Sequence, residues 1–94
     1  MLKIGSVADG NGATTLVVEG DLMGPWVEEL SRSCELALGS TPVLIVDLGA
    51  VTFIDRGGVQ MLRDLVDRDA RLTNCSPFVA EQIKAAEQPK AGDR

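Results

Sequence analysis

The chain has 94 residues, of which 45% are hydrophobic and only three are aromatic: Trp26, Phe53 and Phe78. That length suits one domain, whose core must be built mainly from Val, Leu, Ile and Ala. Fourteen acidic against nine basic residues give a formal net charge of −5. Nucleic acid and anionic membrane surfaces both require a basic face, so we expect neither as the main partner and expect a protein instead.

The compartment follows from what the sequence lacks. No apolar run approaches the roughly 20 residues of a membrane span. The segment Met1-Leu2-Lys3-Ile4 has neither the basic stretch nor the long apolar region of a secretory signal. Cys34 and Cys75 lie far apart in apolar patterns, which predicts two buried free thiols and no disulfide. We therefore expect a cytoplasmic protein without direct membrane insertion.

Two strands are predicted first, over residues 1–7 and 14–19, the second rich in β-branched side chains. Asp9-Gly10-Asn11-Gly12 lies between them and contains an Asp-Gly and an Asn-Gly step. Glycine supplies the positive φ that a tight reversal needs, so this segment predicts a hairpin.

A helix is predicted over residues 25–38. Pro25 suits its first position, and Gly39 is expected to end it as a glycine cap. Apolar side chains recur every four residues along one face, and charged side chains take the other, which is typical of a surface helix. The apolar face consists of Trp26, Leu30, Cys34 and Leu38.

Residues 43–46 form a short run that is apolar on both faces, which predicts a strand in the middle of the sheet. A loop is then expected over residues 47–55, followed by a helix over 57–68 and a short strand within 70–74. The apolar stripe of that helix is Val59, Leu62, Leu65 and Val66.

A third helix is predicted to begin at Ser76-Pro77, with the Ser76 side chain as its cap. Its expected buried side is Phe78, Val79, Ile83 and Ala86. The order β-β-α-β-α-β-α predicts an α/β fold, a mixed sheet of about four strands with three helices packed on it. Residues 1–86 are expected to form the domain and 87–94 a flexible tail.

Catalytic chemistry has little support in this sequence. The chain contains no His and no Tyr, and no phosphate-binding Lys-Ser/Thr pair follows Gly57-Gly58. Asp21, Asp47 and Asp55 are the only candidates for a carboxylate cluster, and helix capping and loop hydrogen bonds are their competing structural roles. We expect no enzymatic activity, no cofactor and no metal site.

The segment from Val43 to Val59 carries a family resemblance. Its core, Asp47-Leu48-Gly49-Ala50-Val51-Thr52-Phe53-Ile54-Asp55-Arg56-Gly57-Gly58, resembles the signature of STAS domains, which sulfate transporters and anti-sigma factor antagonists share. Gly20-Asp21-Leu22 and Cys75-Ser76-Pro77 also fall at family positions. Since one scaffold serves several functions in this family, the resemblance predicts the fold more strongly than the function.

In the regulatory members of that family, a kinase-like anti-sigma factor phosphorylates a serine at the start of the second helix. Gly57 stands at this acceptor position, Arg56 stands at the preceding serine, and Met23 replaces an acidic residue near the site. The resemblance therefore implies that phosphorylation at position 57 does not occur. For Gly57-Gly58 the structural alternative is a tight turn or a close backbone approach, and Thr52 is the nearest hydroxyl, expected in the loop.

The resemblance implies a non-enzymatic protein-interaction module, active in bacterial signalling and transcription regulation, that binds a kinase-like anti-sigma factor through residues 52–59. A cytosolic accessory or scaffold subunit of a lipid-type transporter or a stressosome-like assembly is the alternative. A small-ligand or nucleotide-binding domain ranks third, and a homodimer is compatible with each. The expected partner-binding residues are Asp21, Met23, Trp26, Thr52, Asp55, Arg56, Gly57 and Gly58.

Overall fold

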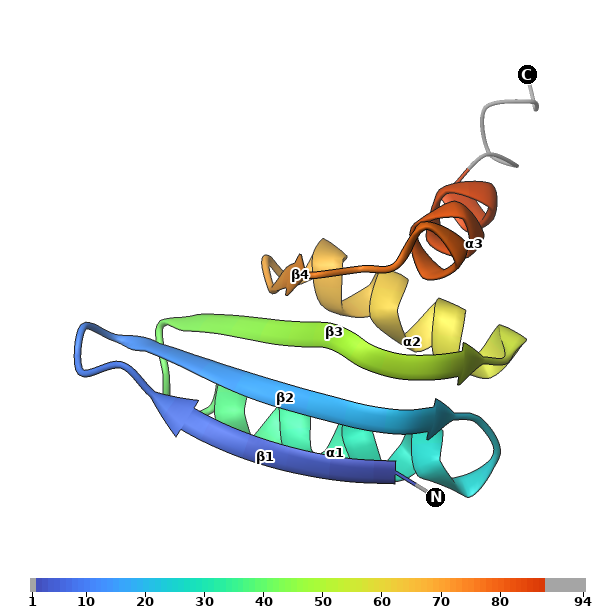
Figure 1. The fold of residues 1–94 in the computed structure, drawn as a ribbon. Helices are drawn as coiled ribbons and strands as arrows, with labels where there is room; N and C mark the ends of the chain where they lie inside the picture. Colours follow the sequence, from blue (N-terminus) through green and yellow to red (C-terminus); the bar gives the residue numbers. More distant parts are fainter. Residues whose placement is uncertain (1, 88–94) are drawn as a thin grey trace.

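A four-stranded mixed sheet with the order β1-β2-β3-β4 carries the fold (Figure 1). The computed structural model describes residues 2–87, with side chains through Lys84. The order of elements is β-β-α-β-α-β-α, as predicted. The elements are β1 Leu2–Ala8, β2 Ala13–Leu22, α1 Pro25–Leu38, β3 Val43–Ile54, α2 Arg56–Asp67, β4 Arg71–Thr73 and α3 Pro77–Glu87.

The predicted hairpin joins β1 and β2, which pair antiparallel from Leu2 opposite Gly20 to Ala8 opposite Thr14. Gly10 and Gly12 have φ values of 80° and 95°, the conformation for which glycine is suited. The Asp9 carboxylate accepts the Asn11 N–H at 2.7 Å and so closes the turn. The prediction of a hairpin is confirmed.

β3 is longer than its apolar run indicated, and the loop predicted over residues 47–55 is wrong. The strand continues to Ile54 and pairs in parallel with β2. Val17 lies opposite Asp47 and Glu19 opposite Ala50, so β3 contains an extra residue there, and a second one enters before Phe53. Each bulge breaks the two-residue alternation that identifies a strand in a sequence.

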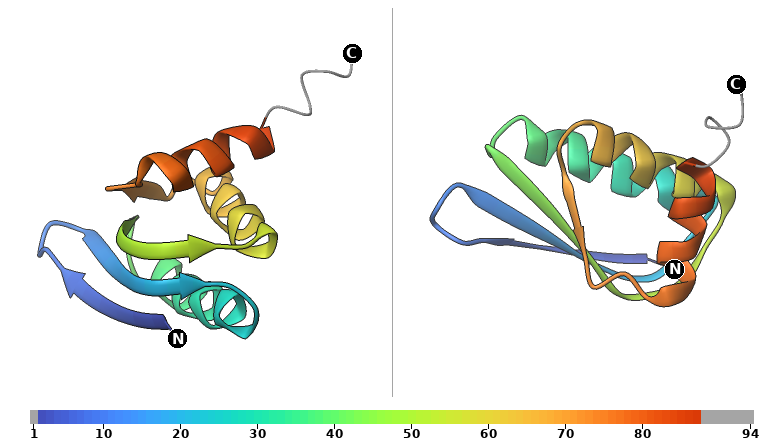
Figure 2. Two further views of the ribbon diagram at one scale, coloured as in Figure 1. Left: turned by 45° about the vertical axis from the view of Figure 1, so that its right-hand side comes forward. Right: turned by 90° about the horizontal axis from the view of Figure 1, so that it is seen from above.

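One face of the sheet is covered by α1 and α2, and α3 packs against α2 beyond β4 (Figure 2). The core between sheet and helices is almost wholly aliphatic, as the composition requires. Its most deeply buried side chains are Val18, Leu22, Leu30, Cys34, Leu44, Val46, Leu48, Leu62 and Val79.

Three side chains of α2 and α3 differ in burial from the prediction. In α2, Met61 is buried and Val66 is exposed, which reverses part of the expected stripe. In α3, Val79 is buried and Ser76 accepts its N–H at 3.2 Å, as expected. Phe78, however, is 49% exposed, so its predicted place in the core is wrong. The Ala86 side chain lies outside the described part of the structure, as do residues 88–94 of the predicted tail.

Gly39 follows α1 with φ −76°, a right-handed conformation, so it is not the left-handed glycine cap that the sequence predicted. Its N–H bonds to the Glu35 carbonyl at 3.2 Å. The chain then leaves the helix through Thr41, whose N–H bonds to the Ala37 carbonyl and whose hydroxyl donates to the Gly12 carbonyl, each at 3.0 Å. Helix α1 is therefore ended by contacts with the hairpin turn, and glycine is not conformationally required there.

Candidate functional site

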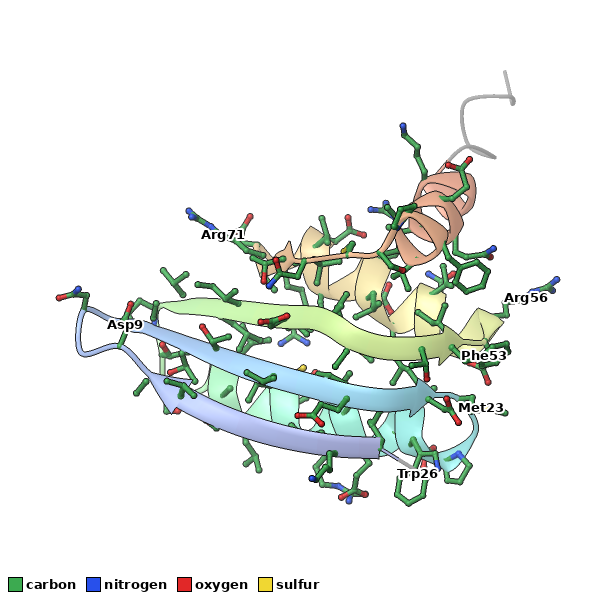
Figure 3. All side chains as sticks on the ribbon, viewed as in Figure 1. Asp9, Met23, Trp26, Phe53, Arg56 and Arg71 are labelled. Atoms are coloured by element: carbon green, nitrogen blue, oxygen red, sulfur yellow. The ribbon has the colours of Figure 1, made fainter. Side chains whose placement is uncertain are left out.

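The carboxyl ends of β2 and β3 meet the starts of α1 and α2 at one end of the molecule. We call this region the docking end and define it by Met23, Trp26, Thr52, Phe53 and Arg56. Met23, Trp26, Phe53 and Arg56 all lie at this end, whereas Asp9 and Arg71 lie at the other (Figure 3). The predicted site residues are thus gathered from two separate stretches of sequence.

Asp55 is the hydrogen-bonding centre of the docking end. Its Oδ1 accepts the Gly58 N–H at 2.8 Å, which caps α2 as predicted. Its Oδ2 accepts the Gly24 N–H at 3.0 Å, and its own N–H donates to the Leu22 carbonyl at 3.1 Å. These backbone donors, Gly24 first and then Gly58, hold the pKa of Asp55 below its ordinary value. One side chain therefore fixes the β2–α1 connection against the start of α2.

Thr52 lies within β3, so its predicted place in a loop is wrong. Its hydroxyl is 2.8 Å from Oδ1 of Asp21 and 3.3 Å from the Gly20 carbonyl oxygen. Asp21 sits on the neighbouring strand, where it pairs with Phe53. Thr52 and Asp21 are therefore brought together as the prediction of a shared site requires.

The three aspartates do not form a carboxylate cluster. Asp47 lies eight residues before Asp55 along β3, about 25 Å away in an extended strand. Its Oδ1 accepts the Gly49 N–H at 2.9 Å, and this bond and one from the Asn74 side chain lower its pKa. Within residues 2–87 there is no group of three or more His, Cys, Asp or Glu side chains placed to hold a metal ion. The carboxylate cluster on which the alternative of acid–base or metal chemistry depended is therefore not formed by Asp21, Asp47 and Asp55 in the described structure.

The two glycines at the start of α2 play different roles. A Cβ on Gly58 would lie 2.8 Å from Cγ1 of Ile54 and 2.9 Å from the Leu22 carbonyl oxygen. The expected close backbone approach therefore exists at Gly58. A Cβ on Gly57 would meet only Oδ1 of Asp55, at 3.5 Å, which is an ordinary contact. The backbone does not require glycine at position 57.

Exposed apolar side chains mark the docking end. Met23 is 40% exposed and Phe53 is 43% exposed, while Trp26 is half-buried against the core. Arg56, at the first position of α2, is exposed. Phe53 was not among the predicted site residues, because its exposure depends on the second bulge of β3. The one feature of the sequence that could have pointed to Phe53 is its position, an aromatic residue directly before Ile54, the apolar residue that ends the strand.

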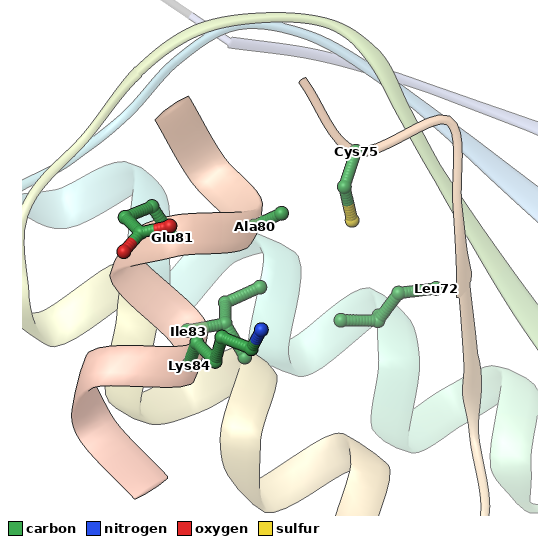
Figure 4. A pocket seen from close by; sticks show the side chains of 6 residues that line it. All are labelled: Leu72, Cys75, Ala80, Glu81, Ile83 and Lys84. Carbon is green, nitrogen blue, oxygen red and sulfur yellow. The ribbon is translucent and has the colours of Figure 1, made fainter. Parts of the chain in front are cut away.

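The two cysteines are free thiols, as predicted, but only Cys34 is buried. Burial, with a further effect of the Glu35 carboxylate, raises the pKa of Cys34 to about 11. Cys75 is half-buried beside a pocket of about 330 Å³ between β4 and α3, and burial raises its pKa too (Figure 4). None of the predicted site residues lines this pocket.

Solved structures show what the fold is similar to. An anti-sigma factor antagonist from Mycobacterium paratuberculosis superposes with a TM-score of 0.77 at 18% identity, covering 97% of this chain and 82% of that one. The anti-sigma factor antagonist SpoIIAA, in its unphosphorylated form, superposes with a TM-score of 0.70 at 18% identity, covering 98% and 95%. This likeness establishes the fold: an α/β STAS fold of the kind found in anti-sigma factor antagonists.

Comparison of the sequence with family models gives no match. A search of curated proteins also gives none. In the described part of the chain, every helix is too short or too polar to cross a membrane.

Proposed function

We propose that this chain is a non-catalytic protein-interaction module that acts in the cytoplasm and binds a regulatory protein through its docking end. Two observations of different kinds support this role. The fold is similar to that of anti-sigma factor antagonists. The observation that carries the proposal is the exposure of Met23 and Phe53 beside a tightly hydrogen-bonded helix start.

Met23 and Phe53 have the character of interface anchors. Aromatic and methionine side chains are enriched at the cores of protein interfaces, and a few such residues carry most of the binding energy. Met23 lies in the β2–α1 connection and Phe53 near the end of β3, and Asp55 bonds to the backbone of that connection at Gly24 and of α2 at Gly58. A surface ordered before binding loses less conformational freedom when the partner arrives.

Arg56 gives the docking end a preference for an acidic group on the partner. Its guanidinium offers a planar set of donors that match a carboxylate or a phosphate. Within the described residues no ion pair joins the Arg56 guanidinium to Asp55, whose two oxygens accept the Gly24 and Gly58 N–H groups. We therefore propose a contact in which apolar anchors lie beside a charged pair.

Regulation by phosphate at the start of α2 is absent in this proposal. Gly57 has no hydroxyl, so no phosphoryl group can be attached there. Binding would then depend on the amounts of the chain and its partner. Phosphorylation of Thr52, whose hydroxyl contacts Asp21, is an outcome that mass spectrometry of the chain after incubation with the partner and ATP would detect.

The test is affinity capture from native cytosol with four baits: wild type, Met23→Lys, Phe53→Lys and the control Phe78→Lys. Phe78 is 49% exposed and lies on α3, so the control makes the same chemical change outside the docking end. A protein retained by wild type and control but lost with both docking-end variants supports the proposal. If every captured protein binds all four baits equally, the docking end is not the binding surface.

The identity of a docking-end-dependent protein separates the two roles. A kinase-like anti-sigma factor supports the regulatory role, and a transporter ATPase or permease supports the accessory role. With the purified partner, Phe53→Ala should raise the dissociation constant about thirtyfold, a typical effect at an interface anchor. Arg56→Ala and Gly57→Asp should each weaken binding as well; unchanged affinity in both would contradict the proposed surface.

A further inference from the structure

β1 forms an outer edge of the sheet and is unusually open to pairing. Its seven residues bond to β2 on one side only, and their register with β2 has no interruption. The strand contains no proline and no bulge, and its single charge is Lys3. Natural edge strands are usually blocked by charges, prolines, bulges or covering segments, because an open edge is a template for another strand.

A groove runs along the same edge on the helix-covered side. Its volume is about 420 Å³, and β1 lines it with Ile4, Ser6 and Ala8. The wall opposite is the second half of α1, where Leu36 is 73% exposed. The groove is lined by a mixture of apolar and hydroxyl side chains, and with Leu36 exposed beside an unpaired strand it is a candidate interaction surface.

We propose that β1 pairs antiparallel with β1 of a second copy of this chain. A two-fold axis perpendicular to the sheet would join two four-stranded sheets edge to edge. It keeps the helix-covered faces on the same side, so the two α1 helices would flank the joined β1 strands. No other chain type is required, because the same edge supplies both sides of such an interface.

The alternation of side chains fixes the register of this pairing. In an antiparallel pair, residues directly opposite each other point to the same face. The groove-lining residues Ile4, Ser6 and Ala8 must therefore oppose residues of the same set. Only a two-fold axis at Gly5 satisfies this condition and pairs all residues from Leu2 to Ala8. Lys3 then lies opposite Val7 of the second copy, so no like charges are opposed.

The groove and Leu36 complement each other under this symmetry. Besides Leu36, α1 contributes Ser33, Ala37 and Ser40 to the groove, and these small side chains leave room in it for a side chain of the second copy. Leu36 of each copy would lie against the groove of the other, next to its apolar lining residues Ile4 and Ala8. This burial would remove from water the most exposed of the large apolar side chains in the described structure.

Sedimentation equilibrium of the full chain over a wide concentration range tests the assembly. Wild type should fit a monomer–dimer equilibrium, and Leu36→Lys should raise its dissociation constant about thirtyfold or more. Phe78→Lys is the matched control and should leave it unchanged. Circular dichroism should show the same folded spectrum for both, since both residues are exposed. A wild type that stays monomeric, or a Leu36→Lys variant that dimerises like the control, overturns the proposal.

Disulfide trapping tests the register separately. A Cβ on Gly5 would have no atom within 4 Å, so Gly5→Cys is compatible with the fold. At the two-fold axis the paired Cα atoms lie about 5 Å apart, within reach of a disulfide. In a Cys75→Ser background, Gly5→Cys should give an oxidised dimer, whereas Val7→Cys, on the same face but away from the axis, should not. Trapping by Val7→Cys alone, or by neither, contradicts this register.

Discussion

The contrast between Gly58 and Gly57 allows a direct test of how α2 is seated. In Gly58→Ala the new methyl group would lie 2.9 Å from the Leu22 carbonyl oxygen and 2.8 Å from Cγ1 of Ile54. The carbonyl cannot turn aside freely, because it accepts the Asp55 N–H. In Gly57→Ala the methyl group meets only a side-chain oxygen at 3.5 Å. The two substitutions are chemically identical and differ by one position in the same helix.

The expected magnitudes follow from two opposing effects. Forcing extra volume into a packed site costs about 1–3 kcal/mol, and the higher value applies where backbone must move. Replacing glycine by alanine in a helix contributes up to about 1 kcal/mol of stability. Gly58→Ala should therefore lose about 2 kcal/mol of unfolding free energy. Gly57→Ala should gain about 0.5–1 kcal/mol, since it carries no steric cost.

Urea unfolding measured by circular dichroism gives both free energies. For a domain of this size, the loss in Gly58→Ala corresponds to a fall in Tm of about 10 °C. Equal denaturant slopes would show that the unfolded ensembles are comparable. If Gly58→Ala is as stable as wild type, or if Gly57→Ala is the less stable of the two, the described seating of α2 on the end of β2 is incorrect.

Three further outcomes are expected. Gly57→Ser should fold with near wild-type stability and become phosphorylated by a kinase-like partner, gaining the mass of one phosphate that wild type does not acquire. Asp55 has a pKa below its ordinary value of 3.8 in the folded state, so its ionised form stabilises the fold above that pH, and this contribution is lost as pH falls through the lowered pKa. The free energy of unfolding in urea should therefore depend less on acid pH in Asp55→Asn than in wild type. An unchanged pH profile would contradict the role of Asp55 as the cap of α2. In the native protein at neutral pH, a thiol reagent should modify Cys75 well before Cys34, because burial and a pKa of about 11 suppress the reactive thiolate of Cys34. Labelling of Cys34 before Cys75 would refute this order.

The sequence predicted the elements whose pattern is regular. Helix α1 begins and ends at the predicted residues, and the hairpin before β2 has the expected glycine conformations. In these segments a single periodicity covers the whole element. The end of β3 could not be predicted in the same way, because two bulges interrupt the alternation over Gly49-Ala50 and Thr52-Phe53.

Tertiary contacts decided the remaining differences. Met61 rather than Val66 faces the core because helix α2 is rotated relative to the assumed stripe, and helical spacing alone allows either. The grouping of Met23 with Arg56 was anticipated in outline, since the ends of neighbouring parallel strands meet, whereas the place of Phe53 beside them was not. The separate roles of Gly57 and Gly58 were not predictable, because they depend on the position of the Leu22 carbonyl oxygen.

The two extra residues in β3 also determine where this strand can lose a residue. Side chains in a regular strand alternate between faces, but at each bulge two neighbours share the exposed side, Gly49 with Ala50 and Thr52 with Phe53. Removing one residue of such a pair would restore the regular alternation and leave every other side chain on the face it has now. A single-codon deletion at either bulge could therefore shorten β3 without turning any core side chain outward.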